Sequence, residues 1–173
     1  MNSLRGALLG LAVGAALIGT SAGSASAKPV DRELITGNQM AVAADPVQTL
    51  KNKATNRCLD DSGKGLRTLG CNGKITQKWQ IHVWPGDQTR QLRSVGTGEC
   101  LDDSHLGLRT ISCWASSNPN SKFQSWYKLT YSDGTIRLQN QSTKRCLDDS
   151  GKGLRTLACY PNSSPNRKFQ SWS

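Results

Sequence analysis

Short runs of strand-forming residues alternate with turn residues along most of this chain, and no segment carries a sustained apolar period of 3.6 residues. Ser-Asp-Gly at 132–134 separates WYKLTY from TIRLQN, which is a strong hairpin signal. Trp-Pro-Gly-Asp at 84–87 occupies the corresponding place between QIHV and QLRSV. Gly-Thr-Gly (96–98) and Ser-Thr-Lys (142–144) mark further turns. The pattern predicts an all-β fold with little or no helix.

The longest apolar run stands at the N-terminus. Residues 7–19 form an apolar core of 13 residues after Arg5, and Ala-Ser-Ala at 25–27 offers a small-residue cleavage site. Thirteen residues are too few to span a bilayer. We therefore expect residues 1–27 to be a signal peptide, cleaved near Ala27. The mature chain of about 146 residues is then secreted and does not insert into a membrane.

A fourteen-residue cassette occurs three times, as CLDDSGKGLRTLGC (58–71), CLDDSHLGLRTISC (100–113) and CLDDSGKGLRTLAC (146–159). The cassettes begin 42 and 46 residues apart, and the likeness continues downstream to a Gln-x-Trp motif in each copy. Self-similarity at a fixed period indicates a repeat architecture. Because propellers need more repeats and solenoids of this period are helical, a closed threefold β-structure fits best.

The six cysteines stand at the two ends of the three cassettes. Pairing within each copy is the only scheme that treats the copies alike, and disulfides persist in exported proteins. The alternative is zinc, whose cysteine ligands usually come in closely spaced C-x₂₋₄-C pairs that this chain lacks. We expect no metal, no other cofactor, and one disulfide per repeat: Cys58–Cys71, Cys100–Cys113 and Cys146–Cys159.

Three repeats of about 45 residues, each with Cys-Leu-Asp near its start and Gln-x-Trp at its end, resemble the ricin-B type β-trefoil lectins over residues 48–173. The resemblance implies a β-trefoil with repeats at about 48–89, 90–135 and 136–173. Threefold symmetry would bring each Trp toward a common centre, and each Gln can satisfy buried backbone groups. We expect these six residues to be structural core: Gln77, Trp79, Gln124, Trp126, Gln170 and Trp172.

Residues 28–47 (KPVDRELITGNQMAVAADPV) precede the repeats as an N-terminal extension. A pure linker is rich in Gly, Ser and Pro, whereas this segment carries Leu34, Ile35, Met40 and Val42. Two interpretations stay open: a flexible terminus, or a segment that docks on a partner as an added strand.

The resemblance also places a sugar pocket at each cassette. In ricin-type trefoils that bind sugar, the Asp after Cys-Leu accepts hydrogen bonds from ring hydroxyls, and an aromatic residue before the second Cys stacks on the sugar. All three copies keep the carboxylate: Asp60, Asp102 and Asp148. All three replace the aromatic by an aliphatic residue: Leu69, Ile111 and Leu157. A conventional galactose site is therefore not expected.

The short repeats are also similar to actinohivin-type trefoil lectins, which bind mannose-rich glycans and carry Asn-Gly before Gln-x-Trp. Asn72 and Gly73 match that pattern in copy 1, whereas copies 2 and 3 have Trp114 and Tyr160 in place of the Asn. Mannose specificity does not follow from a partial match. The two aromatic residues would instead offer a stacking surface from a new direction, which would make sites 2 and 3 better than site 1.

Gly-Leu-Arg-Thr recurs in each cassette across a turn from Asp-Asp-Ser. One interpretation is an Asp–Arg bridge at the hairpin mouth, with the second Asp and the Ser fixing the turn. The other is a small cleft that presents a carboxylate and a guanidinium to a polar or anionic sugar or to a protein loop. The candidate ligand-binding residues are Asp60, Arg67, Asn72, Asp102, Arg109, Trp114, Asp148, Arg155 and Tyr160.

The charge and the remaining polar residues limit the function classes. Without Arg5 the net charge of +10 falls to +9, which favours anionic partners. The cations are scattered without a dense run, which argues against nucleic acid. Catalysis is not expected, because Asp60 and Asp61 are adjacent on an extended stretch and His82 and His105 stand apart from any nucleophile.

Two function classes remain for a secreted, non-catalytic trefoil. One is an adaptor that joins secreted protein partners, such as toxin or lectin subunits, through the trefoil and the N-terminal extension. The architecture resembles the lectin-fold adaptor subunits of actinobacterial umbrella-toxin particles, and the absent stacking residue and the apolar extension favour this class. The other is a free-standing lectin for cell-surface or cell-wall glycans. A trefoil protease inhibitor is disfavoured by the Gln-x-Trp motifs.

Overall fold

The structure, a computed structural model, describes residues 44–173. The predicted signal peptide and most of the predicted extension lie outside these residues. Within them the chain forms eleven strands and three short 3₁₀ helices, and it has no α-helix. The expectation of an all-β fold with little helix is confirmed.

Repeats 1 and 2 contribute the same succession of elements, and repeat 3 has isolated bridges at Trp172 in place of the last strand. Repeat 1 contains β1 (Val47–Gln48), β2 (Arg57–Ser62), β3 (Gly65–Gly70), η1 (Ile75–Gln77) and β4 (Trp79–Val83). Repeat 2 contains β5 (Arg90–Ser94), β6 (Cys100–Ser104), β7 (Gly107–Ile111), η2 (Pro119–Phe123) and β8 (Trp126–Thr130). Repeat 3 contains β9 (Ile136–Asn140), β10 (Arg145–Ser150), β11 (Gly153–Ala158) and η3 (Pro165–Gln170).

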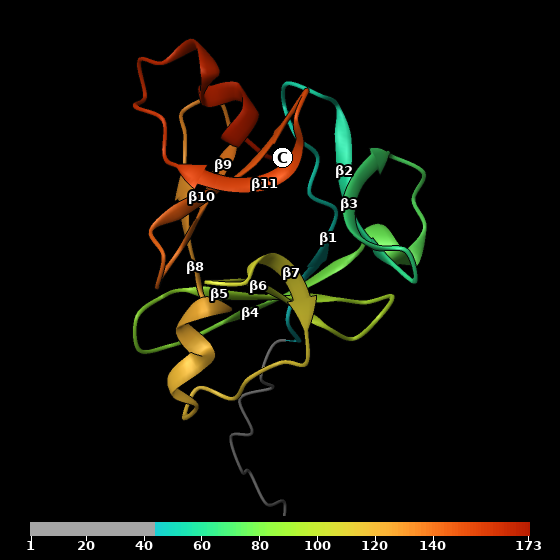
Figure 1. Cartoon of the computed structure of the whole chain (residues 1–173), viewed down its shortest axis with the longest axis vertical. Coiled ribbons are helices and arrows are strands. Elements are labelled where there is room, and N and C mark those ends of the chain that lie inside the picture. The colour runs from blue at the N-terminus through green and yellow to red at the C-terminus, as the bar shows by residue number, and fades with distance from the viewer. Residues whose placement is uncertain (1–43) are drawn as a thin grey trace, which may run out of the picture. The chain divides into compact units, whose positions relative to one another are not determined.

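The cassettes fold into three antiparallel hairpins, β2–β3, β6–β7 and β10–β11. Each hairpin turns at a glycine with positive φ, for example Gly65 at 85°, a conformation that glycine adopts without steric cost. The strands β3, β7 and β11 contact one another pairwise, so the hairpins meet around one axis. Figure 1 shows them as three lobes around a common middle.

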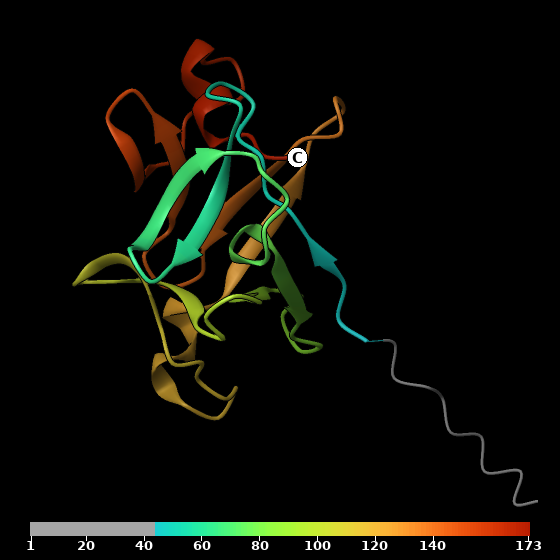
Figure 2. The ribbon, with the colours of Figure 1, turned by 90° about the vertical axis from the view of Figure 1, so that its right-hand side faces the viewer.

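The remaining strands pair between repeats and close the structure. β4 pairs with β5, and β8 pairs with β9, in antiparallel register. The third closure joins the two ends of the trefoil, because Trp172 forms bridges to both Asn52 and Ile136. Ser173 also exchanges backbone hydrogen bonds with Lys51 (2.8 and 2.9 Å), which brings the C-terminus beside the start of repeat 1 (Figure 2).

The residues just before repeat 1 are held on the same structure. Val47 and Gln48 form β1, which pairs with β4, and the carbonyl of Pro46 accepts a hydrogen bond from the backbone N–H of Ile81 (2.9 Å). Asp45 pairs with His82 at 3.0 Å. The end of the predicted extension therefore contacts the trefoil, and the chain enters it at a fixed place beside β4.

Three tryptophans occupy the centre of the core. Trp79, Trp126 and Trp172 are each 0% exposed and belong to one apolar cluster with the leucines of the cassettes. Each indole N–H donates to the carbonyl of the Leu that follows the first cysteine of its own repeat, at 3.0–3.1 Å. The prediction that these tryptophans belong to the core is confirmed. Their indole N–H groups are hydrogen-bonded as well as buried.

The glutamines of the Gln-x-Trp motifs hold the end of each cassette. Gln77 donates to the carbonyl of Gly70 (3.1 Å) and accepts from the backbone N–H of Asn72 (2.9 Å). Gln124 and Gln170 make the same two bonds in their repeats. Because the side chains are fully buried, each pair of bonds fixes the chain on both sides of the second cysteine.

The three predicted disulfides are present, Cys58–Cys71, Cys100–Cys113 and Cys146–Cys159. Each joins the first strand of a hairpin to the residue at or just past the end of the second, with Cα atoms 5.0–5.1 Å apart, within the ordinary range for the bond. Closing a loop of this length stabilises the fold by about 3 kcal/mol in the chain-entropy model.

The second aspartate of each cassette does not fix its own turn, so that part of the sequence interpretation is wrong. It lies one residue past the first aspartate on the same strand and therefore points to the opposite face, toward the next repeat. Asp103 of repeat 2 accepts hydrogen bonds from Arg145 (2.6 Å) and Thr156 (2.7 Å) of repeat 3. The serines alone cap the turns, as when Ser104 accepts from the backbone N–H of Leu106 (3.2 Å).

Candidate functional site

In each cassette the first aspartate and the arginine lie opposite each other on the two strands of the hairpin. We call the surface around this pair the hairpin mouth. Antiparallel register makes Asp60 and Arg67 cross-strand neighbours, and the same pairing holds in the other two hairpins. The shortest N–O distances are 3.5 Å in copy 1, 3.3 Å in copy 2 and 3.2 Å in copy 3. The predicted Asp–Arg bridge is confirmed in all three copies.

Burial controls the electrostatics of these carboxylates. Burial raises the pKa of Asp102 and Asp148 above the ordinary 3.8, although Arg109 and Arg155 partly offset the effect. A raised pKa means that the folded state takes up a proton more readily than the unfolded chain. The contribution of these two groups to folding stability is therefore lost as the pH rises through their folded pKa, and they do not drive acid unfolding.

One buried carboxylate oxygen in each of two copies accepts no hydrogen bond from the described residues. These are Oδ2 of Asp148 and Oδ1 of Asp60, and the latter has only the ion pair with Arg67 at 3.5 Å. The other oxygen of Asp60 accepts from Thr76 (2.9 Å), whereas copies 2 and 3 have phenylalanine at that position. A buried acceptor without a donor is costly, and a ligand hydroxyl would satisfy it.

Copy 2 gathers three of the predicted site residues into one pocket. Asp102, Arg109 and Trp114 line a shallow pocket of about 100 Å³ together with Asn120 and Phe123. Trp114 is half-buried and is fixed through its backbone N–H, which donates to Gln124 (2.8 Å). The two extra residues come from η2: Asn120 belongs to the loop insertion that copy 1 lacks, and Phe123 stands where copy 1 has Thr76.

Asn72 and Tyr160 stand where Trp114 stands in copy 2, since their backbone N–H groups are held by Gln77 and Gln170. The side chain of Asn72 accepts from the backbone N–H of Lys74 (3.0 Å) and so serves the local turn. The carbonyl of Tyr160 accepts from Arg137 (2.7 Å). The three copies are therefore equivalent in backbone and different in the side chain that each offers at this position.

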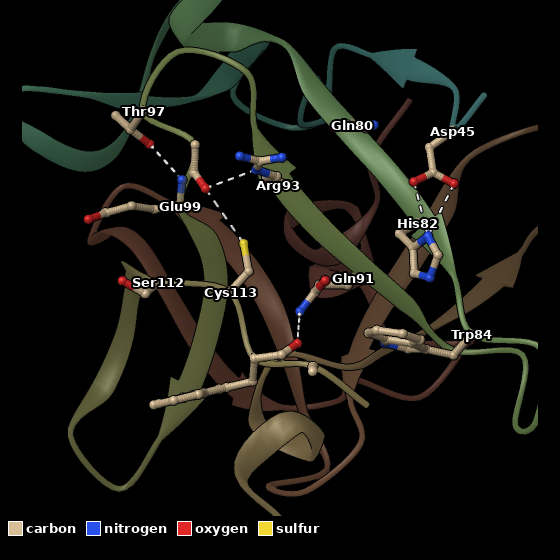
Figure 3. A pocket seen from close by; sticks show the side chains of 13 residues that line it. Asp45, Gln80, His82, Trp84, Gln91, Arg93, Thr97, Glu99, Ser112 and Cys113 are labelled. Atoms are coloured by element: carbon tan, nitrogen blue, oxygen red, sulfur yellow. Dashed lines mark hydrogen bonds and ion pairs between the residues drawn. The ribbon is translucent and has the colours of Figure 1, made fainter. Parts of the chain in front are cut away.

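A wider pocket of about 710 Å³ lies on the outer face of β4 and β5 (Figure 3). Its polar groups are largely paired within the chain. Gln91 donates to the carbonyl of Trp114 (3.0 Å), Arg93 donates to the carbonyl of Gly98 (3.0 Å), and His82 pairs with Asp45. These three polar side chains are therefore engaged within the chain rather than free to hold a ligand.

The histidines and acidic residues form no metal centre in the part of the chain that the structure describes, where no three His, Cys, Asp or Glu side chains gather. His82 is 41% exposed and lies edge-on to Trp84, and His105 is exposed in the β6–β7 turn. Among residues 44–173, none belongs to a helix long and apolar enough to cross a membrane.

The threefold core and the three cassette hairpins define a β-trefoil. The family model described as "Ricin-type beta-trefoil lectin domain" matches residues 46–172. The chain therefore belongs to this family. A search of curated protein sequences finds no match.

Solved structures share the fold at low sequence identity. The designed threefold-symmetric protein ThreeFoil has 19% identity and a TM-score of 0.58, with 73% of this chain and 95% of that chain covered. SeviL bound to asialo-GM1 saccharide has 13% identity and a TM-score of 0.60, with 74% and 94% covered. The GlcNAcα1-4Gal releasing endo-β-galactosidase from Clostridium perfringens has 15% identity and a TM-score of 0.61, with 73% of this chain but only 31% of that chain covered.

Proposed function

We propose that the protein is a secreted, non-catalytic lectin that binds glycans at its hairpin mouths, with copy 2 as the principal site. The observation that carries the proposal is the convergence of Asp102, Arg109 and Trp114 on one open pocket. Membership of the ricin-type lectin family and the fold shared with SeviL, whose structure holds a saccharide, support it.

The chemistry of the pocket suits a sugar. The Asp102 carboxylate would accept hydrogen bonds from hydroxyl groups, the Arg109 guanidinium would donate them, and the half-buried Trp114 ring would stack on the apolar face of a ring. In this arrangement Trp114 takes over the stacking role that Ile111 cannot perform. A pocket of about 100 Å³ fits the end of a glycan better than it encloses a whole ligand.

A glycan array with the purified protein tests the proposal. We expect Asp102→Asn and Trp114→Ala each to weaken the glycan binding of copy 2 by about tenfold or more, since each removes a charge-assisted hydrogen bond or a stacking contact. Trp114→Asn is the matched variant, because it gives copy 2 the residue that copy 1 carries at this place. Glycan binding that all three variants retain, or an array with no bound glycan, would contradict the proposal.

A second candidate function is that of an adaptor in an extracellular assembly. In this function the N-terminal extension would hold a protein partner. The supporting observation is the anchored entry of the chain: β1 pairs with β4, and Asp45 pairs with His82. Asp45 and β1 thereby hold the start of the described chain beside β4. A partner that binds the preceding residues would be tethered to the trefoil at this point.

The adaptor function predicts that partner capture depends on residues 28–43. We expect the chain that begins at residue 44 to fold normally, because Asp45 and β1 remain, and to lose the proteins that the longer chain captures from the producer's culture fluid. Circular dichroism checks the fold, and mass spectrometry identifies the captured proteins. Equal capture by both chains would rule out a role for the extension.

A further inference from the structure

The second aspartates of the cassettes build three junctions between successive repeats, and two of the junctions contain the same clamp. Asp149 of repeat 3 is 0% exposed and accepts from Arg57 Nη2 (2.6 Å) and Nε (3.2 Å) and from Thr68 (2.8 Å) of repeat 1. Arg57 Nη2 also donates to the carbonyl of Ser150 (3.1 Å), and Thr55 donates to Asp149. The guanidinium thus joins one carboxylate and one carbonyl across the junction.

The clamp between repeats 2 and 3 has the same geometry. Arg145 donates to Asp103 through Nη2 (2.6 Å) and Nε (3.1 Å), and to the carbonyl of Ser104 (3.1 Å). Thr143 and Thr156 donate to the same carboxylate. Two independent copies therefore show that this set of acceptors binds a guanidinium group in two-point fashion.

The junction between repeats 1 and 2 lacks the arginine. Asp61 is 1% exposed and accepts from Thr97 and from Thr110 (2.9 Å), which correspond to the two threonines of each clamp. The residue before the first cysteine, which is Arg57 in repeat 1 and Arg145 in repeat 3, is Glu99 here. Among the described residues, neither Asp61 nor Glu99 forms an ion pair, so a buried carboxylate and a half-buried one share this junction without a cation paired to either.

The space at this junction is open. A pocket of about 480 Å³ is lined by Asp61, Ser62, Thr97, Glu99 and Thr110. Asp61 and Ser62 correspond to the aspartate and serine that accept from a guanidinium in the other two junctions. Arg109 also lines the pocket, but its Nε lies 3.3 Å from Asp102 on the other face of the hairpin. In the complete clamps the arginine side chains are 37% exposed, so the corresponding position can be reached from solvent.

We infer that this junction is a binding site for an arginine side chain presented by a protein partner. The incoming guanidinium would take the place of the missing arginine, donating to both oxygens of Asp61 and to the carbonyl of Ser62, while Glu99 adds a second negative charge at the entrance. The inference does not depend on glycan binding, because the groups that would hold the guanidinium, Asp61, Ser62 and Glu99, do not line the pocket of copy 2.

The acceptor set favours arginine over other cations. Three acceptors at a carboxylate and a neighbouring carbonyl match the planar fork of a guanidinium, whereas a lysine ammonium is a point charge without that fixed geometry. The chain is basic overall, with a net charge of +10, so an unpaired acidic junction is a local exception on its surface. An arginine supplied from outside would pair with Asp61 and join the two repeats.

Titration of the ¹⁵N-labelled full chain by NMR at low ionic strength tests the inference, with N-acetyl-L-arginine methylamide as the probe. We expect shifts at the backbone amides of Asp61, Thr97 and Thr110, and about tenfold weaker effects from the lysine and citrulline analogues, which lack the fork or the charge. Glu99→Arg should abolish the shifts because it fills the site from within. Asp61→Asn should weaken binding about tenfold or more.

Two further arms keep the outcome decisive. Glu99→Gln removes the outer charge without filling the pocket, so it should bind the probe more weakly than the parent chain but still detectably, even if Asp61→Asn fails to fold. Arg32→Gln, in the N-terminal extension, identifies the source of the arginine that occupies the site. Tighter probe binding by this variant would show that the chain's own Arg32 competes for the site. Unchanged binding leaves an external partner as the source. Absent shifts, equal shifts with the citrulline analogue, or full binding by Glu99→Arg would each overturn the inference.

Discussion

Trp126→Ala is expected to destabilise the protein by about 3–5 kcal/mol, the range found when a large aromatic residue is removed from a packed core. Trp126 is 0% exposed, and its indole N–H donates to the carbonyl of Leu101 at 3.0 Å. The substitution therefore leaves a cavity and an unpaired buried carbonyl at the point where the three repeats meet. Since whole domains are stable by about 5–15 kcal/mol, urea denaturation followed by circular dichroism should detect a large loss.

Trp114→Ala is the control for this experiment, because Trp114 is half-buried at the rim of the copy 2 pocket and is held through its backbone. We expect it to change the free energy of unfolding by less than about 1 kcal/mol. The two substitutions thus separate a core tryptophan from a candidate ligand-binding one. Equal losses would mean that Trp114 is part of the core and would also weaken the proposed lectin site.

Local features of the sequence were sufficient to predict the fold. The repeated cassette fixes the hairpin register because its two cysteines, the Asp–Arg pair and the turn glycine are all within one segment of fourteen residues. The Gln-x-Trp motif then places one indole per repeat in the centre. Each of these contacts lies within a single copy, so a pattern read along the chain is enough to find it.

Contacts between copies could not be found in the same way. Arg57 and Asp149 are 92 residues apart, and nothing in either cassette shows which face of the hairpin meets the next repeat. Aligning the copies does carry a signal: Arg precedes the first cysteine in copies 1 and 3, whereas Glu99 precedes it in copy 2. A strict threefold repeat that breaks at one charged position points to a residue with a role between repeats.

The candidate site was predicted in part for the same reason. The Asp–Arg pairs are local and were found, while the pocket of copy 2 is also lined by Asn120 from η2, which sequence reasoning did not assign to it. Trp114 was proposed as a stacking surface because it follows the second cysteine, and the structure does bring it beside Asp102 and Arg109. Whether this pocket binds a glycan stays a prediction.

Exchanging the charges at the junctions is the second substitution with a large expected effect. Arg145→Glu places a second carboxylate beside the fully buried Asp103 and removes the cation that pairs with it among residues 44–173. Breaking a buried ion pair from one side costs about 3–5 kcal/mol, and because Arg145 is 37% exposed, we expect about 2–3 kcal/mol. Glu99→Arg is the matched opposite change and should stabilise the protein by about 1–3 kcal/mol, because it completes the third clamp with charge-assisted hydrogen bonds.

Urea denaturation of the two variants at low and high salt measures both effects. The destabilisation by Arg145→Glu should shrink only slightly in salt, since Asp103 is buried and poorly screened. If Glu99→Arg leaves the stability unchanged or lowers it, the junction between repeats 1 and 2 cannot accommodate a guanidinium as the other two do. That result would remove the physical basis for an arginine site there. A junction that does not accept the arginine introduced at residue 99 would not accept one from a partner.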